Sequence, residues 1–276
     1  MSVAVLVVGN EILDGSTVDT NSGWVCGRIS DRGAAVVRTA VVADDEAEIA
    51  AGVDFLRAAG PRLLITVGGL GPTRDDMTVA AVATHLGVPL AEDAAAARIV
   101  ERQYAALAAR GGGRATTSEV RDARAKMARL PQGAHALDNQ IGSAPGVWLD
   151  HEELAVLNLP GVPAEMKDIF TGSADVHLRR VLGDGHVRSA EVVIRTNDES
   201  EIAGSLAAFD ARHGGLGVYL KSRARQFGGD LRLQATISAR GADPDDVENR
   251  LESAIDGFTT ILAAAGIDVL AVTRDA

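Results

Sequence analysis

The chain has 276 residues, of which 46% are hydrophobic and 24% charged. That balance is typical of a soluble globular protein and excludes an intrinsically disordered one. Its 38 acidic and 27 basic residues leave a net charge of -11, which opposes binding to nucleic acid through counterion release. The single cysteine, Cys26, excludes an intramolecular disulfide and argues against a cysteine-based zinc site. We therefore expect a cytoplasmic protein of about two domains.

The first half of the chain alternates short β-branched runs with alanine-rich amphipathic segments. This pattern predicts an α/β fold with three layers (α/β/α) and a mostly parallel sheet. The apolar run at the N-terminus lacks a basic leader, and no run of about 18 apolar residues exists, so we expect neither a signal peptide nor a membrane span. Strands are predicted over 3–8, 34–42 and 63–67, and helices over 20–30, 45–59, 76–86, 93–110 and 118–128.

The pattern changes after residue 145. Strands are predicted over 146–149 and 154–159, followed by a helix from Pro163 to about Leu182. The glycines of 183–185 predict a boundary between a domain over 1–182 and a small α+β domain over 186–276. In that tail we expect strands over 187–196, 216–221 and 230–239 and helices over 199–213 and 244–265, the last with Asp243 as N-cap.

Ligands of an open parallel sheet bind outside the carboxyl ends of its strands, so the loops that follow the strands hold the candidate site. The first loop carries Glu11, and Asn21 and Ser22 stand where the next helix starts. Asp44 follows the second strand. Asn21 and Ser22 also suit a helix N-terminus, and Asp44 is a plausible N-cap of the helix over 45–59, so a purely structural role of these loops stays open.

The loop after the third strand is rich in glycine and acid. Three glycines between a strand and a helix let the backbone approach a phosphate closely, although neither a Walker A loop nor a G-x-G-x-x-G fingerprint is present. A variant capping box, Thr73-x-x-Asp76, is an alternative reading that does not explain the glycines or Asp75. The candidate residues of this loop are Gly68, Gly69, Gly71, Thr73, Asp75 and Asp76.

A phosphate beside these acids would be repelled, and a divalent metal resolves that conflict. We therefore expect a site for a diphosphate together with magnesium, manganese or cobalt. Two later loops follow or precede strands and are candidates for positioning the substrate, with a pair of ordinary turns as the alternative. Their candidate residues are Asn139, Gly142, Ser143, Pro160 and Gly161.

Several motifs occur in an order that resembles a known family. They are Asn10-Glu11-Ile12-Leu13-x-Gly15, Asp19-Thr20-Asn21-Ser22, Gly68-Gly69-Leu70-Gly71-Pro72-Thr73-x-Asp75-Asp76-x-Thr78, Gly142-Ser143-Ala144-Pro145-Gly146 and Leu159-Pro160-Gly161-Val162-Pro163-x-Glu165-Met166. Together they resemble the N-terminal region of the competence/damage-inducible CinA family, which contains a MoaB/MogA-like domain. The tail resembles that family's small KH-like middle domain. The deamidase domain of full-length members has no counterpart here, so its activity is not expected.

The resemblance implies a metal-dependent nucleotide pyrophosphatase that hydrolyses the diphosphate of ADP-ribose-like substrates. It implies catalytic roles for Asp44, Asp75 and Asp76, which with Glu11 would hold the metal, and phosphate contacts from the glycine loop. Two other readings stay open: a molybdopterin-binding protein of molybdenum-cofactor biosynthesis, and a non-catalytic module that senses a nucleotide. Relatives of this kind form oligomers, and we expect a homo-oligomer, with a dimer favoured.

The tail contains a G-x-x-G over 214–217, with Lys221, Arg223 and Arg225 nearby. Such a loop clamps nucleotides in KH domains, but a glycine turn in a solvated hairpin is the plainer reading. The acidic net charge and the few aromatic residues favour the plainer one, so no nucleic-acid partner is expected. Cys26 stands among apolar residues of a predicted helix, and we expect it in the core.

Overall fold

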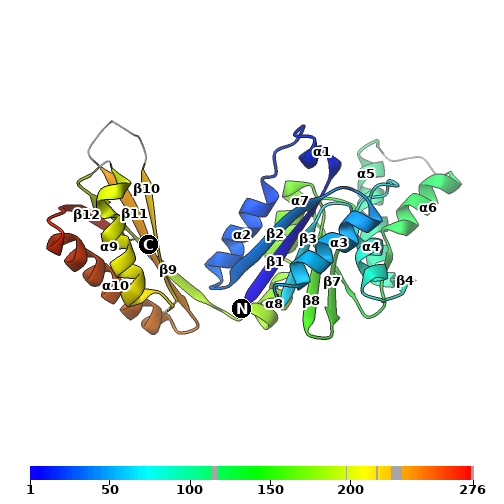
Figure 1. Cartoon of the computed structure of the whole chain (residues 1–276). Helices are drawn as coiled ribbons and strands as arrows, with labels where there is room; N and C mark the ends of the chain where they lie inside the picture. Colours follow the sequence, from blue (N-terminus) through cyan, green and yellow to red (C-terminus); the bar gives the residue numbers. More distant parts are fainter. Residues whose placement is uncertain (113–116, 197, 216, 225–231, 275–276) are drawn as a thin grey trace. The chain divides into compact units, whose positions relative to one another are not determined.

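The computed structural model describes residues 1–112, 117–196, 198–215, 217–224 and 232–274. Contacts divide the chain into two compact units (Figure 1). The larger comprises Met1–Ser30 and Ala34–Gly183, and the smaller comprises Asp31–Gly33 and Asp184–Ala276. Among the described residues, no helix is long and apolar enough to cross a membrane.

The larger unit is built on a six-stranded sheet whose first four strands are parallel. The last two strands run antiparallel to their neighbours. In spatial order the strands are β2 (Ala35–Val42), β1 (Ser2–Val8), β3 (Leu63–Val67), β8 (Leu154–Leu159), β7 (Gly146–His151) and β6 (His135–Leu137). The predicted mostly parallel sheet is therefore confirmed. Its four parallel strands end at the same edge.

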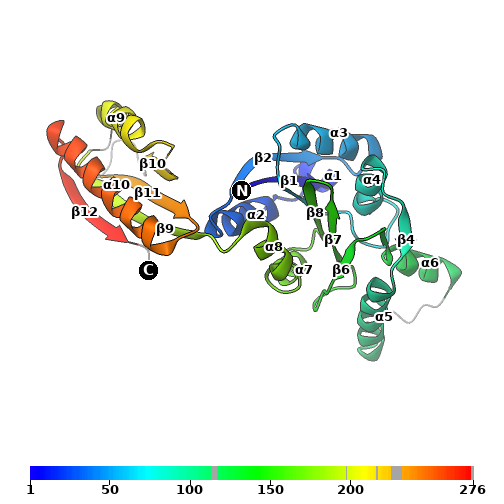
Figure 2. The same ribbon diagram turned by 90° about the horizontal axis from the view of Figure 1, so that it is seen from below.

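Helices cover both faces of this sheet, which confirms the predicted three layers (Figure 2). Alternate residues of β1 enter two separate cores, because successive strand side chains point to opposite faces. One face packs against α2 (Asn21–Asp31), α7 (Pro163–Thr171) and α8 (Asp175–Leu182). The other packs against α3 (Glu46–Arg57) and α4 (Thr78–His85).

Several further elements complete the larger unit. They are α1 (Asn10–Leu13), α5 (Ala94–Ala109), α6 (Ser118–Lys126) and an antiparallel pair of β4 (Leu90–Glu92) and β5 (Arg129–Pro131). The elements α1, β4, β5 and β6 were not predicted from the sequence, because three or four residues are too few to show a periodicity.

Three sequence-based expectations are wrong at helix termini. The helix expected from Pro163 to Leu182 is two helices, because α7 ends before Gly172 and α8 begins at Asp175. The helix after the glycine loop begins at Thr78, with Met77 as its N-cap. Asp45, and not Asp44, caps α3 by accepting hydrogen bonds from two backbone N–H groups. A fourth expectation, which concerns burial, is also wrong: Cys26 is half buried on α2 and does not lie in the core.

The smaller unit is a four-stranded antiparallel sheet in the order β10-β11-β9-β12, with α9 and α10 packed on one face. Its elements are β9 (His186–Ile194), η1 (Glu199–Ile202), α9 (Ala203–His213), β10 (Val218–Ala224), β11 (Leu233–Gly241), α10 (Pro244–Ala264) and β12 (Val269–Arg274). Asp243 caps α10 as predicted. The strand β12 was missed because most of its residues are exposed. Three residues used in the predictions, Leu216, Arg225 and Asp230, lie outside the described residues.

Candidate functional site

The loops that follow the parallel strands meet in one cleft with a volume of about 490 Å³. This convergence follows from the topology, because β1, β2, β3 and β8 end at the same edge of the sheet. The residues that line the cleft are Val8, Glu11, Asp44, Gly68, Gly69, Leu70, Gly71, Pro72, Asp75, Asp76, Ser143, Ala144, Pro160, Gly161, Val162 and Glu165.

The charged side chains that line the cleft are all acidic. Glu11, Asp44, Asp75, Asp76 and Glu165 are carboxylates, and none of the described residues in the lining is a lysine, arginine or histidine. An anionic ligand in this cleft would meet like charges at short range, a cost of kilocalories per pair where water is displaced. A cation beside such a ligand would offset this repulsion.

The glycines of the loop are required by its own packing. Gly68 and Gly69 have φ angles of 109° and 69°, which disfavour any residue with a side chain. A Cβ on Gly68 would overlap the carbonyl oxygen of Val8, and one on Gly69 would overlap the hydroxyl of Thr78. The same tight packing brings Gly161 against Gly68. The glycines thus place the loop backbone on the floor of the cleft.

Asp75 and Asp76 converge on one hydroxyl. The Thr73 Oγ1 lies 2.5 Å from Asp75 Oδ1 and 2.5 Å from Asp76 Oδ2, and the Thr73 N–H donates to Asp76 Oδ2 at 2.8 Å. The hydrogen bond from Thr73, with help from the charge of Lys126, holds the pKa of Asp75 below its ordinary value. Because α4 begins later, these bonds close a turn within the loop, and the reading of Thr73 as the cap of that helix is wrong.

Asp44 and Glu11 belong to the first two loops. The Asp44 Oδ2 accepts a 2.8 Å hydrogen bond from the backbone N–H of Asn10. The Glu11 carboxylate folds back over Gly9, where a Cβ would lie 2.7 Å from Glu11 Oε1. Asp45 supplies the cap of α3, so the carboxylate of Asp44 is held in the cleft by the first loop and not by the helix.

Asn139 shapes the opposite wall from a fully buried position. Its Oδ1 accepts hydrogen bonds from the N–H groups of Ile141 and Gly142 at 3.0 and 2.8 Å. Its Nδ2 donates to the carbonyl of Ala144 and to Glu165 Oε2, both at 2.8 Å. Asn139 thus folds the loop and fixes Glu165, an acid of the cleft that sequence reasoning did not select. Glu165 lies in the first turn of α7, where an acidic residue is ordinarily explained by its favourable interaction with the helix dipole.

Five predicted substrate contacts, Asn21, Ser22, Thr73, Asn139 and Gly142, do not line the cleft. The Asn21 Nδ2 donates to the carbonyl of Gly161 at 2.7 Å, and the Ser22 hydroxyl donates to Asp19. Asn21 thus ties the start of α2 to the loop after β8, whereas the bond of Ser22 is local to the start of its own helix. The predicted Glu11, Asp44, Gly68, Gly69, Gly71, Asp75, Asp76, Ser143, Pro160 and Gly161 do line it.

A model of the family described as probable molybdopterin binding domain matches residues 4–180. The chain is similar to the solved structure of the protein CinA, of unknown function, from Thermoplasma acidophilum, with 32% sequence identity and a TM-score of 0.56. The match covers 66% of this chain and 99% of that chain. The chain belongs to the CinA family. Its larger unit is the MoaB/MogA-like domain of this CinA-family protein.

Two further relatives are similar to this chain. Over 258 residues the chain is 35% identical to a protein of Caldivirga maquilingensis, covering 92% of this chain and 94% of the relative. A CinA-like protein of Geobacter sulfurreducens is 36% identical over 219 residues, covering 79% of this chain and 51% of the relative. The match therefore spans about half of that longer protein.

The arrangement of the carboxylates limits how a metal could bind. Within the part of the chain that the structure describes, no group of three or more His, Cys, Asp and Glu side chains is placed to hold a metal ion. The predicted four-carboxylate set is thus not gathered as a resident cage. Asp75 and Asp76 nevertheless converge on Thr73, and magnesium in proteins is commonly bound by one or two carboxylates plus substrate phosphates. The residues fit a metal that arrives with a diphosphate.

Proposed function

We propose that the cleft binds the diphosphate of an ADP-ribose-like nucleotide as its complex with a divalent cation and hydrolyses it. The observation that carries this proposal is the lining of the cleft, where five carboxylates face a glycine-rich backbone. Backbone N–H groups at such a loop suit phosphate oxygens. The carboxylates oppose a bare phosphate and favour a phosphate whose charge a metal has neutralised.

The residues divide into distinct roles under this proposal. Asp75 and Asp76 would hold the cation, and the hydrogen bond from Thr73 that lowers the pKa of Asp75 also fixes the position of that carboxylate. A bound divalent cation supplies charge neutralisation of the phosphoryl group and a more acidic water. Asp44, fixed by the Asn10 N–H, would orient the attacking water as a hydrogen-bond acceptor. Ser143 and the backbone of Gly161 would position the substrate on the facing wall.

The experiment is hydrolysis of ADP-ribose by the full chain, followed as release of AMP with magnesium, manganese or cobalt and with none. We expect AMP only with a metal. The Asp76→Asn variant should lose on the order of 100-fold or more in kcat, with an unchanged circular-dichroism spectrum. The control is Glu48→Gln, which removes an exposed acid of α3 outside the cleft lining and should leave kcat as it is.

Full turnover in Asp76→Asn would remove that residue from the mechanism. Absence of AMP with every metal, together with a rise in melting temperature on adding ADP-ribose, would replace hydrolysis by nucleotide sensing. The proposal of a diphosphate site fails if neither hydrolysis nor binding of a metal–diphosphate complex is found.

A second candidate is a molybdopterin-binding protein, which the family match over residues 4–180 favours. A pterin that carries a phosphate could use the same glycine loop. The two candidates differ in ligand preference, so a phosphorylated pterin that binds more tightly than ADP-ribose and is released unchanged would favour the carrier function.

A further inference from the structure

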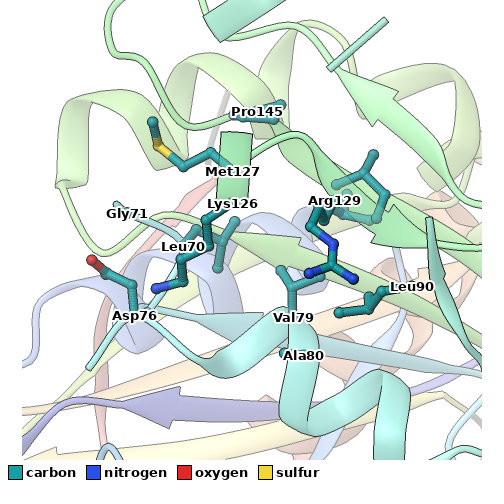
Figure 3. A pocket seen from close by; sticks show the side chains of 13 residues that line it. Leu70, Gly71, Asp76, Val79, Ala80, Leu90, Lys126, Met127, Arg129 and Pro145 are labelled. Atoms are coloured by element: carbon teal, nitrogen blue, oxygen red, sulfur yellow. The ribbon is translucent and has the colours of Figure 1, made fainter. Parts of the chain in front are cut away.

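A second pocket, whose lining Figure 3 shows, shares the glycine loop with the acidic cleft. Gly69, Leu70, Gly71 and Asp76 line both spaces, so the loop is their common wall. The pocket has a volume of about 160 Å³. A ligand with one part at the glycine loop therefore has a hollow next to it for a neighbouring part.

The lining of this pocket differs from that of the cleft. Apolar side chains of α4, the β4–β5 pair, the end of α6 and β7 form most of it, namely Val79, Ala80, Leu90, Met127, Leu130 and Val147. Ligand pockets of this kind are mainly apolar with a few polar groups that fix orientation. Two cations, Lys126 and Arg129, also line it. It therefore offers both the apolar surface and the positive charge that the cleft lacks.

Lys126 stands at the junction of the two spaces. Its ammonium donates a hydrogen bond to the carbonyl of Thr73, in the same turn that holds Asp75 and Asp76. Figure 3 shows its side chain directed toward Asp76. Burial lowers the pKa of Lys126, and the charges of Asp76 and Asp75 act in the opposite direction. A phosphate at this junction would meet a lysine on one side and the glycine backbone on the other.

We infer that this apolar pocket holds the planar nitrogen heterocycle of the ligand, while Lys126 contacts the phosphate nearest to it. The inference rests on the proposed function, because the diphosphate at the glycine loop sets where the heterocycle lies. An apolar cavity of about 150 Å³ accommodates a benzene-sized ring, so the pocket matches a ring and not a whole nucleoside. Purines and pterins are flat fused bicycles with polar edges, so the pocket matches one ring of such a bicycle, and Lys126 and Arg129 lie where polar edges could meet them.

The test compares two unreactive ligands by titration calorimetry with magnesium, using the full chain. Methylenediphosphonate carries only the diphosphate, and α,β-methylene-ADP adds the nucleoside. We expect the nucleotide to bind more tightly by about tenfold or more, because only it can fill the apolar pocket. A parallel titration with a phosphorylated pterin shows which heterocycle the pocket prefers.

Variants separate the ring pocket from the phosphate site. Ala80→Leu fills the pocket from α4 and should abolish the advantage of the nucleotide while leaving diphosphonate affinity unchanged. Leu90→Phe fills it from β4 and serves as the second variant if the first does not fold. Thr84→Leu places the same leucine side chain at an exposed position of α4 outside the pocket, and should keep the advantage. Lys126→Met should weaken both ligands by a similar factor.

The outcomes distinguish the two proposals. If the wild-type chain binds diphosphonate with magnesium but gains nothing from the nucleoside, or if Ala80→Leu and Leu90→Phe keep the full gain, the ring pocket is overturned and the diphosphate site stands. If the wild-type chain binds neither ligand with any divalent metal, the proposed function itself is overturned.

Discussion

The carboxylate of Asp44 accepts a 2.8 Å hydrogen bond from the backbone N–H of Asn10, thirty-four residues earlier in the chain. The bond joins the loop after β2 to the loop after β1 at the carboxyl edge of the sheet. Asp45, its neighbour, accepts hydrogen bonds from Ala47 and Glu48 at the start of α3. Two adjacent aspartates therefore have separate roles, one toward the cleft and one toward the helix.

The separate roles of Asp44 and Asp45 predict that alanine at one position lowers activity and alanine at the other lowers stability. Asp45→Ala removes the N-cap and should cost about 1 kcal/mol of unfolding free energy, with hydrolysis by the folded protein unchanged. Asp44→Ala should change stability less and should reduce AMP release strongly. Urea unfolding and the hydrolysis assay measure the two properties on the same samples. A loss of activity in Asp45→Ala equal to that in Asp44→Ala would contradict the division.

The glycine loop gives a prediction about stability alone. Gly68→Ala should cost more than about 4 kcal/mol, because its Cβ would overlap the carbonyl oxygen of Val8 at a φ of 109°. Gly87→Ala is the matched control, since Gly87 also has a positive φ of 70° but nothing lies within 4 Å of a Cβ there. It should cost about 1–2 kcal/mol. Equal losses in urea unfolding would show that the loop can relax away from Val8.

The hydrogen bond between Asn139 and Glu165 can be tested by exchanging the amide and the carboxylate between the two positions. Asn139→Asp replaces the donor to Glu165 by an oxygen and leaves the carbonyl of Ala144 without that donor. The loss of buried hydrogen bonds should cost roughly 1–3 kcal/mol, and repulsion between the two carboxylates adds to it at neutral pH. The double variant with Glu165→Gln returns a donor to the pair and should recover part of the loss. A double variant no more stable than Asn139→Asp would show that the contact does not matter.

The sequence predicted the layers and the edge of the sheet that bears the cleft, because long apolar runs such as that of β1 identify buried parallel strands. Parallel strands end together, so Glu11, Asp44 and the glycine loop could be placed near one another without coordinates. Whether these residues act as proposed stays a prediction.

Other features depend on contacts that no local pattern records. The choice between Asp44 and Asp45 as helix cap is set by Asn10, far away in the chain. The sequence predicts Asn139 as a substrate contact, but its four side-chain hydrogen bonds are all internal. The apolar pocket is formed partly by β4 and β5, whose three residues each give no periodic signal.

His213 predicts a pH dependence in the smaller unit. Its ring is buried and stacks on Phe209 with centroids 4.8 Å apart, and its Nε2 has no hydrogen-bond partner among the described residues. Burial, assisted by the charge of Arg212, lowers the pKa of His213 below its ordinary value of 6.5. Because the unfolded chain then binds more protons than the folded one, the stability that His213 contributes is complete above pH 6.5 and is lost as the pH falls below it.

Hydrogen exchange of the α9 and α10 amides, followed by mass spectrometry on the full chain, measures this effect in the smaller unit. Protection corrected for intrinsic exchange should fall between pH 7 and pH 5 in the wild-type chain. His213→Met removes the titrating group at similar volume and should flatten that fall, whereas substitution of the exposed residue Arg212 by Gln should leave most of it, since burial is the larger cause. An equally steep fall in His213→Met would assign the pH dependence to another group.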